Sequence, residues 1–289
     1  MTSHPIDSII SLLADDSRHV FKVCAETLIS MGAEAVPALE MATESPDPVL
    51  AKRATRVLNR IRAGINERAF GVFLEACGED IDLEEGSLLI ASIVNPGCNS
   101  AHYSGLLDEM ADQVARRLGP SRELDAVVRA MRSEMFGALG FSGSHEDYED
   151  PSNCLMDRVI DSRTGIPITL SLVYLFLGRR IGVEFTGIAL PGHFLVGLPG
   201  AATEGPWIDP FHGGRTVDRG QIDQYLAERR IPALEVPLEP ATPLQVIQRL
   251  LRNLHLAYER REDRARAAMV GRWEQMAAGE SPPPLPPTL

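Results

Sequence analysis

The sequence predicts an α+β protein with a helical N-terminal half, a core in which a helix precedes a small antiparallel sheet, and a helical C-terminus. Three observations support this. Apolar residues recur at helical spacing through much of 6–139. The segment 168–181 is apolar nearly all round, which is typical of a helix covered on most sides. Three short apolar runs then follow, separated by glycine and proline, as in short strands.

Length and composition limit the classes of protein to consider. The 289 residues suit about two domains, at roughly 150 residues per domain. The net charge of −12 disfavours a nucleic-acid partner, and no apolar run approaches the roughly 18 residues of a membrane span. The N-terminus lacks the pattern of a signal peptide, and the four cysteines show no paired spacing. We therefore expect a cytoplasmic protein with reduced thiols.

The first 62 residues are expected to form short helices. Helices are predicted over 6–14 and 17–31, with Ser17 as the N-cap of the second, followed by a turn at 35–39. The next helix should turn one apolar face inward, made of Ala51, Ala54, Val57, Leu58 and Ile61. This succession resembles about one and a half copies of a HEAT-type helical repeat, which buries its faces by stacking on neighbours. A plain helical subdomain is the alternative.

The following segment is again helical and ends in a loop. Helices are predicted over 67–77, 83–94, 101–118 and 122–139, the second of them capped by Asp82. The polar, glycine-rich stretch 140–153 should be an ordered surface loop, and 154–161 a short helix.

The central helix and strands follow directly. Gly165 breaks what precedes, and Pro167 suits the first position of a helix, where its missing N–H costs nothing. Strands are predicted over 183–190, 193–198 and 207–209, with an edge strand at 215–217. They place two polar residues, His193 and Asp209, on neighbouring apolar strands.

The C-terminal part is predicted to be helical and then extended. Asp218 should cap a helix over 219–229, and 243–258 and 263–276 should form a helical hairpin. The proline-rich residues 277–289 are expected to be a disordered tail, because proline runs stay extended.

Several motifs resemble one known family. NCLMDRVIDSRTGIPITLSLVYLFLGRRIG, GIALPGHFLVGL and WIDPF occur in an order that resembles the transglutaminase-like core of the bacterial SirB-type family. DLEEGSLLIASIVNP and GFSGSHEDYEDPSN resemble that family's helical lead-in. The resemblance covers roughly 81–214 and implies a papain/transglutaminase-like core. The expected organisation is a HEAT-like segment (1–64), a helical lead-in (65–145), the core (146–235), a helical hairpin (240–276) and the tail.

The resemblance also implies the positions of a catalytic triad. The wider superfamily uses cysteine, histidine and aspartate, and the last two fall on His193 and Asp209. The nucleophile position falls on Pro167, which has no reactive side chain. A carboxylate can orient an imidazole, and residues on adjacent strands can meet. The remnant dyad could be a structural polar pair, part of a binding pocket, or catalytic.

Other nucleophiles and a metal site are weaker hypotheses. Cys154 is the nearest thiol in sequence before His193, although cysteine is commonly buried. Thr169 and Ser171 are expected to bond back to the preceding helical turn. The atom types of His193, Asp209 and His212 suit a metal, but no metal-binding spacing supports one. We expect neither metal nor cofactor.

The function predicted from these residues is protein interaction or regulation by a domain that lacks its catalytic cysteine. The alternatives are a cysteine-protease-like hydrolase or acyl transferase with an unorthodox nucleophile, and a small-ligand-binding module. The expected partner is a protein, with no nucleic acid and no membrane. The candidate binding residues are Asn153, Arg163, Tyr174 and His212. Caps and ion pairs on a solvated face are expected for Asn153, Asp157, Arg158 and Arg163.

Overall fold

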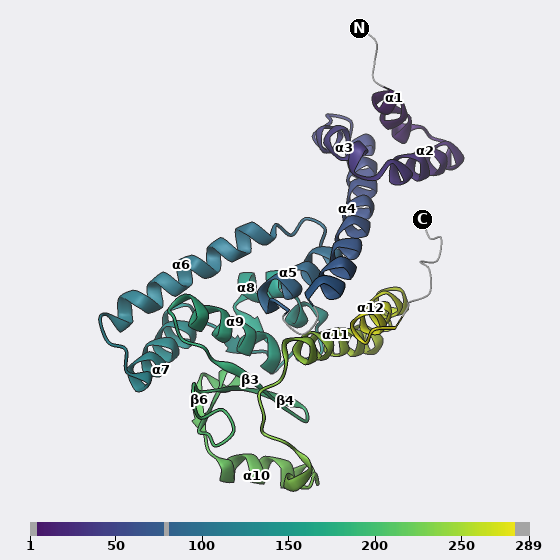
Figure 1. Ribbon diagram of the computed structural model, residues 1–289. Helices are drawn as coiled ribbons and strands as arrows, with labels where there is room; N and C mark the ends of the chain where they lie inside the picture. Colours follow the sequence, from purple (N-terminus) through teal and green to yellow (C-terminus); the bar gives the residue numbers. More distant parts are fainter. Residues whose placement is uncertain (1–4, 78–80, 281–289) are drawn as a thin grey trace. The chain divides into compact units, whose positions relative to one another are not determined.

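The computed structural model describes residues 5–77 and 81–280 (Figure 1). Among them, 5–73 and 89–98 form one compact unit, and 74–77, 81–88 and 99–280 form a second. Helices dominate, and a small antiparallel sheet lies in the second unit, so the predicted α+β class is confirmed. Within the described ranges, no helix combines the length and apolar character needed to cross a membrane.

The first unit is built from helices around its own core. Leu13, Leu28 and Leu39 are fully buried there against the predicted apolar face of the following long helix. Residues 36–39 of the expected turn instead begin a helix, which tolerates Pro37 because the missing N–H lies in its first turn. The elements are α1 (Pro5–Ser11), η1 (Leu12–Ala14), α2 (Arg18–Met31), η2 (Gly32–Ala35), α3 (Val36–Thr43) and α4 (Pro48–Cys77).

The long helix α4 corrects the sequence prediction of two helices here. It runs unbroken for 30 residues, so the expected boundary at residue 64 lies inside it. A single glycine such as Gly64 costs a helix only about 1 kcal/mol. The side chain of Asn66 donates a hydrogen bond to the Ser92 carbonyl (3.0 Å), which favours continuing the helix. Ser92 lies in α5 (Leu83–Val94), which begins as predicted.

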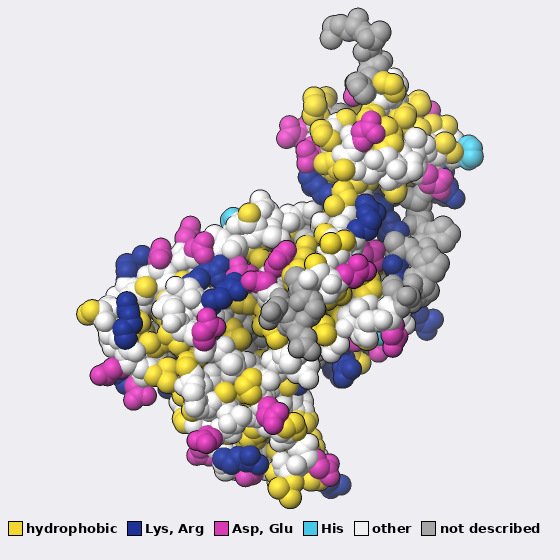
Figure 2. All heavy atoms as spheres, in the orientation of Figure 1, with side chains coloured by type: hydrophobic (Ala, Val, Ile, Leu, Met, Phe, Trp, Pro, Cys, Tyr) yellow, Lys and Arg dark blue, Asp and Glu magenta, His cyan; other side chains and the backbone are white. Residues whose placement is uncertain are grey.

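An ion-pair network joins the start of α5 to two helices of the second unit. Glu84 accepts hydrogen bonds from Ser104 of α6 (Ser100–Leu118) and from Arg179 and Arg180 of α9 (Pro167–Arg180). Arg180 also pairs with exposed Asp108 (2.6 Å). Around α6 and α7 (Leu124–Ser133), acidic and basic side chains are interspersed on the face that Figure 2 shows.

Helix α9 is the buried centre of the second unit, as predicted. Pro167 lies in its first turn, and its residues are buried on nearly every side. It packs against the four-stranded antiparallel sheet β3-β4-β5-β6, and Ser171 lies 3.4 Å from the Phe194 carbonyl. The strands are β3 (Thr186–Leu190), β4 (His193–Gly197), β5 (Trp207–Asp209) and β6 (Arg215–Val217), the last at an edge as expected.

The expected surface loop 140–153 is partly buried. Ser142–Gly143 (β1) pairs in parallel with Thr164–Gly165 (β2). Asn153 is buried in η4 (Pro151–Cys154) and donates hydrogen bonds to Ser144 (3.1 Å) and to the Asp147 carbonyl (2.7 Å). The loop is therefore fixed beside the start of α8 (Met156–Ser162).

The C-terminal elements match their predicted positions closely. Asp218 caps α10 (Arg219–Glu228), and Thr242 caps α11 (Pro243–Arg260). Helix α11 forms a hairpin with α12 (Arg264–Ala277). Most of the predicted tail, 281–289, lies outside the described residues.

Candidate functional site

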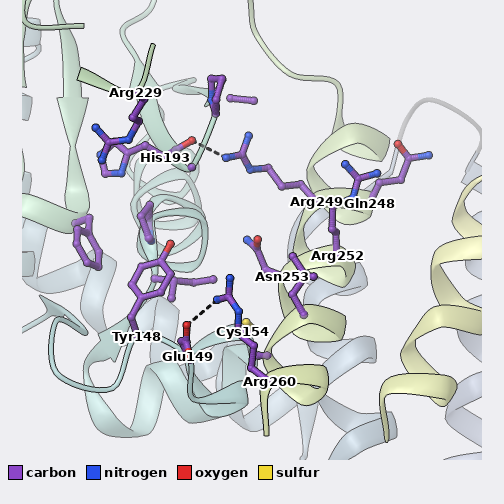
Figure 3. Close-up of a pocket in the computed structure, with 18 of the residues that line it drawn as sticks. Tyr148, Glu149, Cys154, His193, Arg229, Gln248, Arg249, Arg252, Asn253 and Arg260 are labelled. Atoms are coloured by element: carbon purple, nitrogen blue, oxygen red, sulfur yellow. Dashed lines mark hydrogen bonds and ion pairs between the residues drawn. The ribbon is translucent and has the colours of Figure 1, made fainter. Parts of the chain in front are cut away.

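The second unit contains a cleft of about 870 Å³ between the start of α9, the sheet and α11 (Figure 3). Pro167 lines it together with His193 and His212. The position at which the sequence resemblance expects a nucleophile therefore opens into the same cleft as the histidine, and it carries a pyrrolidine ring. Ile166, Ala189, Pro191 and Leu256 add apolar surface to the lining. Its aromatic and polar members include Tyr148, Glu149, Phe211, Tyr225, Arg229, Gln248, Arg249, Arg252, Asn253 and Arg260.

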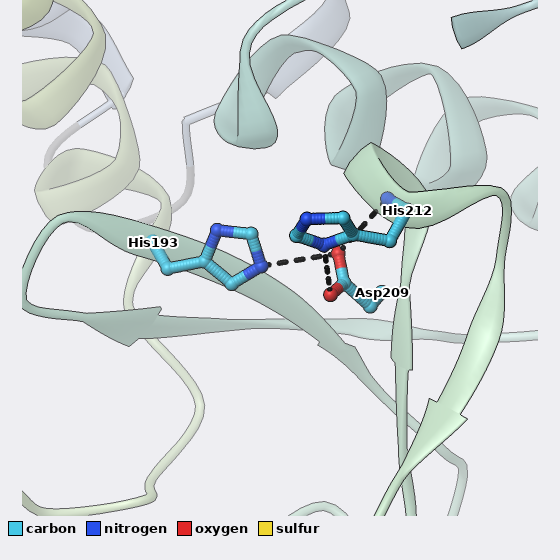
Figure 4. Close-up of side chains that lie close together, drawn as sticks. All are labelled: His193, Asp209 and His212. Carbon is cyan, nitrogen blue, oxygen red and sulfur yellow. Dashed lines mark hydrogen bonds and ion pairs between the residues drawn. The ribbon is translucent and has the colours of Figure 1, made fainter. Parts of the chain in front are cut away.

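His193 and Asp209 form a direct pair (Figure 4). His193 is the first residue of β4 and Asp209 the last of β5, so the antiparallel pairing brings them together. The distance between His193 Nε2 and Asp209 Oδ1 is 3.0 Å. The contact expected from the sequence is present, and it is largely sealed, since His193 is 8% exposed and Asp209 1%.

Asp209 is held as a carboxylate. Burial by itself raises the pKa of this carboxyl, but the hydrogen bonds and charges of His193 and then His212 outweigh it and lower the pKa to about 2. His212 Nδ1 lies 2.6 Å from Asp209 Oδ2, and Arg215 lies 3.4 Å from the same oxygen. Both oxygens of Asp209 are therefore acceptors at neutral pH.

The charge on Asp209 determines the tautomer of His193. An ionised carboxylate only accepts hydrogen bonds, so the Nε2 that faces it must carry the proton. A neutral His193 then keeps its lone pair on Nδ1. This is the state in which a carboxylate orients a histidine as a general base. The dyad therefore has the geometry of a base, whatever its role.

With this geometry in place, comparison with known proteins identifies the family. A family model of the transglutaminase-like superfamily matches residues 101–252. The chain belongs to that superfamily. No solved structure matches it.

Its relatives include the bacterial SirB-type proteins. A UPF0162 protein of Xylella fastidiosa (strain Temecula1 / ATCC 700964) is 33% identical over 210 residues, 69% of each chain. Protein SirB1 of Salmonella typhimurium is 22% identical over 173 residues, which are 59% of this chain and 64% of that one. F-box only protein 21 of Homo sapiens is 30% identical over 188 residues, 61% of this chain and 29% of that protein.

The other possible nucleophiles of this transglutaminase-like core are poorly placed for attack. Cys154 lines the cleft but is only 3% exposed, and burial, followed by the charge of Asp150, raises its thiol pKa to about 12. A thiol in that state is protonated at neutral pH, and the thiolate is the nucleophile. Thr169 Oγ1 lies 2.9 Å from the Asn153 carbonyl and accepts the Ile166 amide. These contacts give the hydroxyl a structural role.

The candidate binding residues are divided between the cleft and the core. His212 lines the cleft. Asn153, Arg163 and Tyr174 lie outside the described lining. Asn153 fixes its loop, and Arg163 packs over the Phe141 ring, 5.0 Å from its centre. Tyr174 is fully buried, and burial raises its pKa. Sequence spacing indicated their neighbourhood but not the direction of their side chains.

The polar residues in and just before α8 do not all lie on the solvated face that the sequence suggested. Asp157 and Asn153 are buried, and Arg158 lies 3.7 Å from Asp157 with half of its side chain exposed. The cluster helps to hold the loop and helix that precede α9.

Three side chains in the cleft also have the composition of a metal site. His193, Asp209 and His212 each offer one ligand atom, and these atoms lie within 4.8 Å of one another. Two histidines and a carboxylate are a common set for catalytic zinc. Here His193 Nε2 and His212 Nδ1 already face Asp209, so a metal bound by these two nitrogens would have to displace the proton on each of them. The sequence prediction of no metal stays a prediction.

The wall of the cleft formed by α11 was missed by sequence reasoning. Eight lining residues come from this one helix, at spacings that place them on one face: Gln245, Gln248, Arg249, Arg252, Asn253, Leu256, Ala257 and Arg260. A signal was present, since three arginines fall on one polar face beside a buried apolar one. The sequence could not show what that polar face would meet.

Proposed function

We propose that this protein is a transglutaminase-like domain without thioester chemistry, which binds a segment of a partner protein in the His193 cleft and so acts in interaction or regulation. The observation that carries the proposal is Pro167, which lines the cleft and stands where the sequence resemblance expects the superfamily's cysteine. Cys154, which shares the lining, is protonated and buried. A dyad without a nucleophile cannot form a thioester.

The lining of the cleft supports a protein segment as the ligand. Tyr148, Phe211 and Tyr225 supply ring surfaces, and α11 supplies arginine, glutamine and asparagine. Tyrosine and arginine dominate the energetics of protein–protein contacts. The thiols of Cys24 and Cys154 are free, which fits a cytoplasmic site of action.

Site-specific photocrosslinking tests this proposal. A benzophenone amino acid replaces Asn253, a half-buried residue of the lining, in cells that express the full chain. The matched control carries it at Leu234, which is fully exposed and outside the lining. We expect a protein adduct from position 253 that is absent from position 234. Identical adduct patterns from both positions, or none from 253, would contradict the proposal.

A second candidate function is hydrolysis with water as the nucleophile. The observation that favours it is the oriented His193, whose Nδ1 retains a lone pair for proton abstraction. In that case ester or peptide hydrolysis would be measurable and would disappear in His193→Ala. Under the leading proposal, the purified protein hydrolyses neither substrate faster than His193→Ala does, and an iodoacetamide probe at pH 7 leaves Cys154 unlabelled.

A further inference from the structure

The charge of the cleft differs from that of the whole chain. The chain has a net charge of −12, and its acidic and basic side chains mix on the face shown in Figure 2. The cleft lining has one carboxylate, Glu149, and four arginines: Arg229, Arg249, Arg252 and Arg260. Figure 3 shows the last three on the same helix, along one side of the cleft. Such a local excess of positive charge in a cleft favours an anionic ligand.

Two of these arginines are already engaged. Arg260 pairs with Glu149 at 3.0 Å, so the single carboxylate of the lining is used. Arg229 stacks on the Tyr225 ring, 3.7 Å from its centre, and donates to the carbonyl of the same residue (3.2 Å). Arg249 and Arg252 have no carboxylate partner within 5–77 and 81–280. They lie one helical turn apart and face the same space.

The positive charge of Arg249 lies in a half-buried, energetically unfavourable position. Its Nη2 donates to the carbonyls of Leu190 (2.5 Å) and His193 (2.8 Å), at the turn between β3 and β4. A guanidinium has five N–H donors, so the remaining edge is available for another acceptor. Burial lowers the pKa of Arg249 and outweighs the opposite effects of Tyr148 and Tyr225, while the charge of Arg252 adds to the lowering. A half-buried cation without a counter-ion is unfavourable unless an anion joins it.

We infer that Arg249 and Arg252 bind the carboxylate side chains of an acidic segment in the partner protein. The inference rests on the proposed function and specifies the class of partner. Two guanidiniums one turn apart can each bind a carboxylate, and the fork of arginine suits that geometry. The segment lies along α11 and passes His193 on the opposite wall, with Tyr148 and Tyr225 at its sides. The overall negative charge of the chain disfavours a long polyanion such as nucleic acid.

Fluorescence anisotropy with the full chain tests the inference. The probe is a fluorescein-labelled ten-residue peptide that alternates glutamate with glycine, and its control replaces each glutamate by glutamine. We expect at least tenfold tighter binding of the glutamate peptide, weakening as salt rises. Arg252→Glu should lower its affinity at least tenfold. Arg116→Glu, the same charge change at an exposed residue of α6 outside the cleft, should leave it within about twofold.

Each other outcome has a definite meaning. Equal losses of peptide affinity in Arg252→Glu and Arg116→Glu would show that the peptide binds by general charge attraction, and this would overturn the inference. Equal binding of both peptides, or no binding of the glutamate peptide, would also overturn it. In these cases a protein adduct from position 253 would still support the proposed function. If that adduct were also absent, the proposed function would be refuted together with the inference about the arginines. Displacement by millimolar inorganic phosphate but not by glutamate would assign the arginines to a phosphoryl group and refute the carboxylate assignment.

Discussion

Replacing Asp209 with asparagine should destabilise the fold in a pH-dependent way. Asp209 is 1% exposed and accepts hydrogen bonds from two histidine rings and from the backbone amide of His212. Asparagine keeps only one acceptor oxygen, and its NH₂ group would face a ring N–H. One buried donor would then lack its partner, or one histidine would have to change tautomer.

The expected size follows from the pKa. The carboxyl pKa falls from an ordinary value of 3.8 to about 2 in the folded chain. At roughly 1.4 kcal/mol per pKa unit, ionised Asp209 contributes about 2 kcal/mol to the free energy of unfolding at pH 7. Because the folded pKa is the lower one, this contribution is complete above the unfolded pKa and is lost as pH falls towards 2. About 1 kcal/mol should remain at pH 3.

Urea unfolding of the parent and Asp209→Asn at pH 7 and pH 3 measures this difference. Asp223→Asn, at an exposed ion pair of α10, is the control and should cost less than about 0.5 kcal/mol. His193→Ala should cost roughly 1–3 kcal/mol, and the double variant should cost less than the sum of the two single changes. An Asp209→Asn loss that is absent at pH 7, or equally large at both pH values, would refute the argument.

Two further predictions concern α9 and a helical glycine. Pro167→Cys should give a thiol with a pKa of roughly 4–7, because a helix start and His193 both favour a thiolate. The rate of alkylation of this thiol against pH, with and without His193→Ala, measures the pKa. A pKa near 8.5 in both proteins would contradict the site assignment. Gly178→Ala should lower stability by roughly 1–3 kcal/mol, because its Cβ would overlap the Phe185 ring. Gly105→Ala, with open space around it, should instead raise the free energy of unfolding by up to about 1 kcal/mol. Thermal unfolding measures both variants, and a similar loss of stability in both would contradict the role of the Phe185 ring.

The features that could be predicted from the sequence are those set by local chemistry. Ser17, Asp82 and Asp218 cap helices because their side-chain oxygens accept amide hydrogen bonds nearby in the chain. Gly165 and Pro167 mark the start of α9 for similar local reasons. The pairing of His193 with Asp209 could also be predicted, because adjacent strands limit where two side chains can lie.

The features that were missed depend on contacts distant in sequence. Strands of two residues, as in β1 and β2, are too short to show a period. The continuity of α4 involves Asn66 and its partner on α5, and the burial of Asn153 and Asp157 depends on how their loop folds back. The α11 wall shows the same limit, since helical spacing predicts which residues share a face but not which neighbour that face meets.

The contact of Arg249 with the β3–β4 turn has a consequence for how this protein can be divided. A fragment ending at residue 235, where the core was expected to stop, would leave the Leu190 and His193 carbonyls without their guanidinium donor. It would also lose every cleft residue that α11 provides. The family match extends to residue 252, just past Arg249. A fragment that keeps the cleft intact therefore has to include α11, which packs against α9 and η4 of the core and is covered on another side by α12.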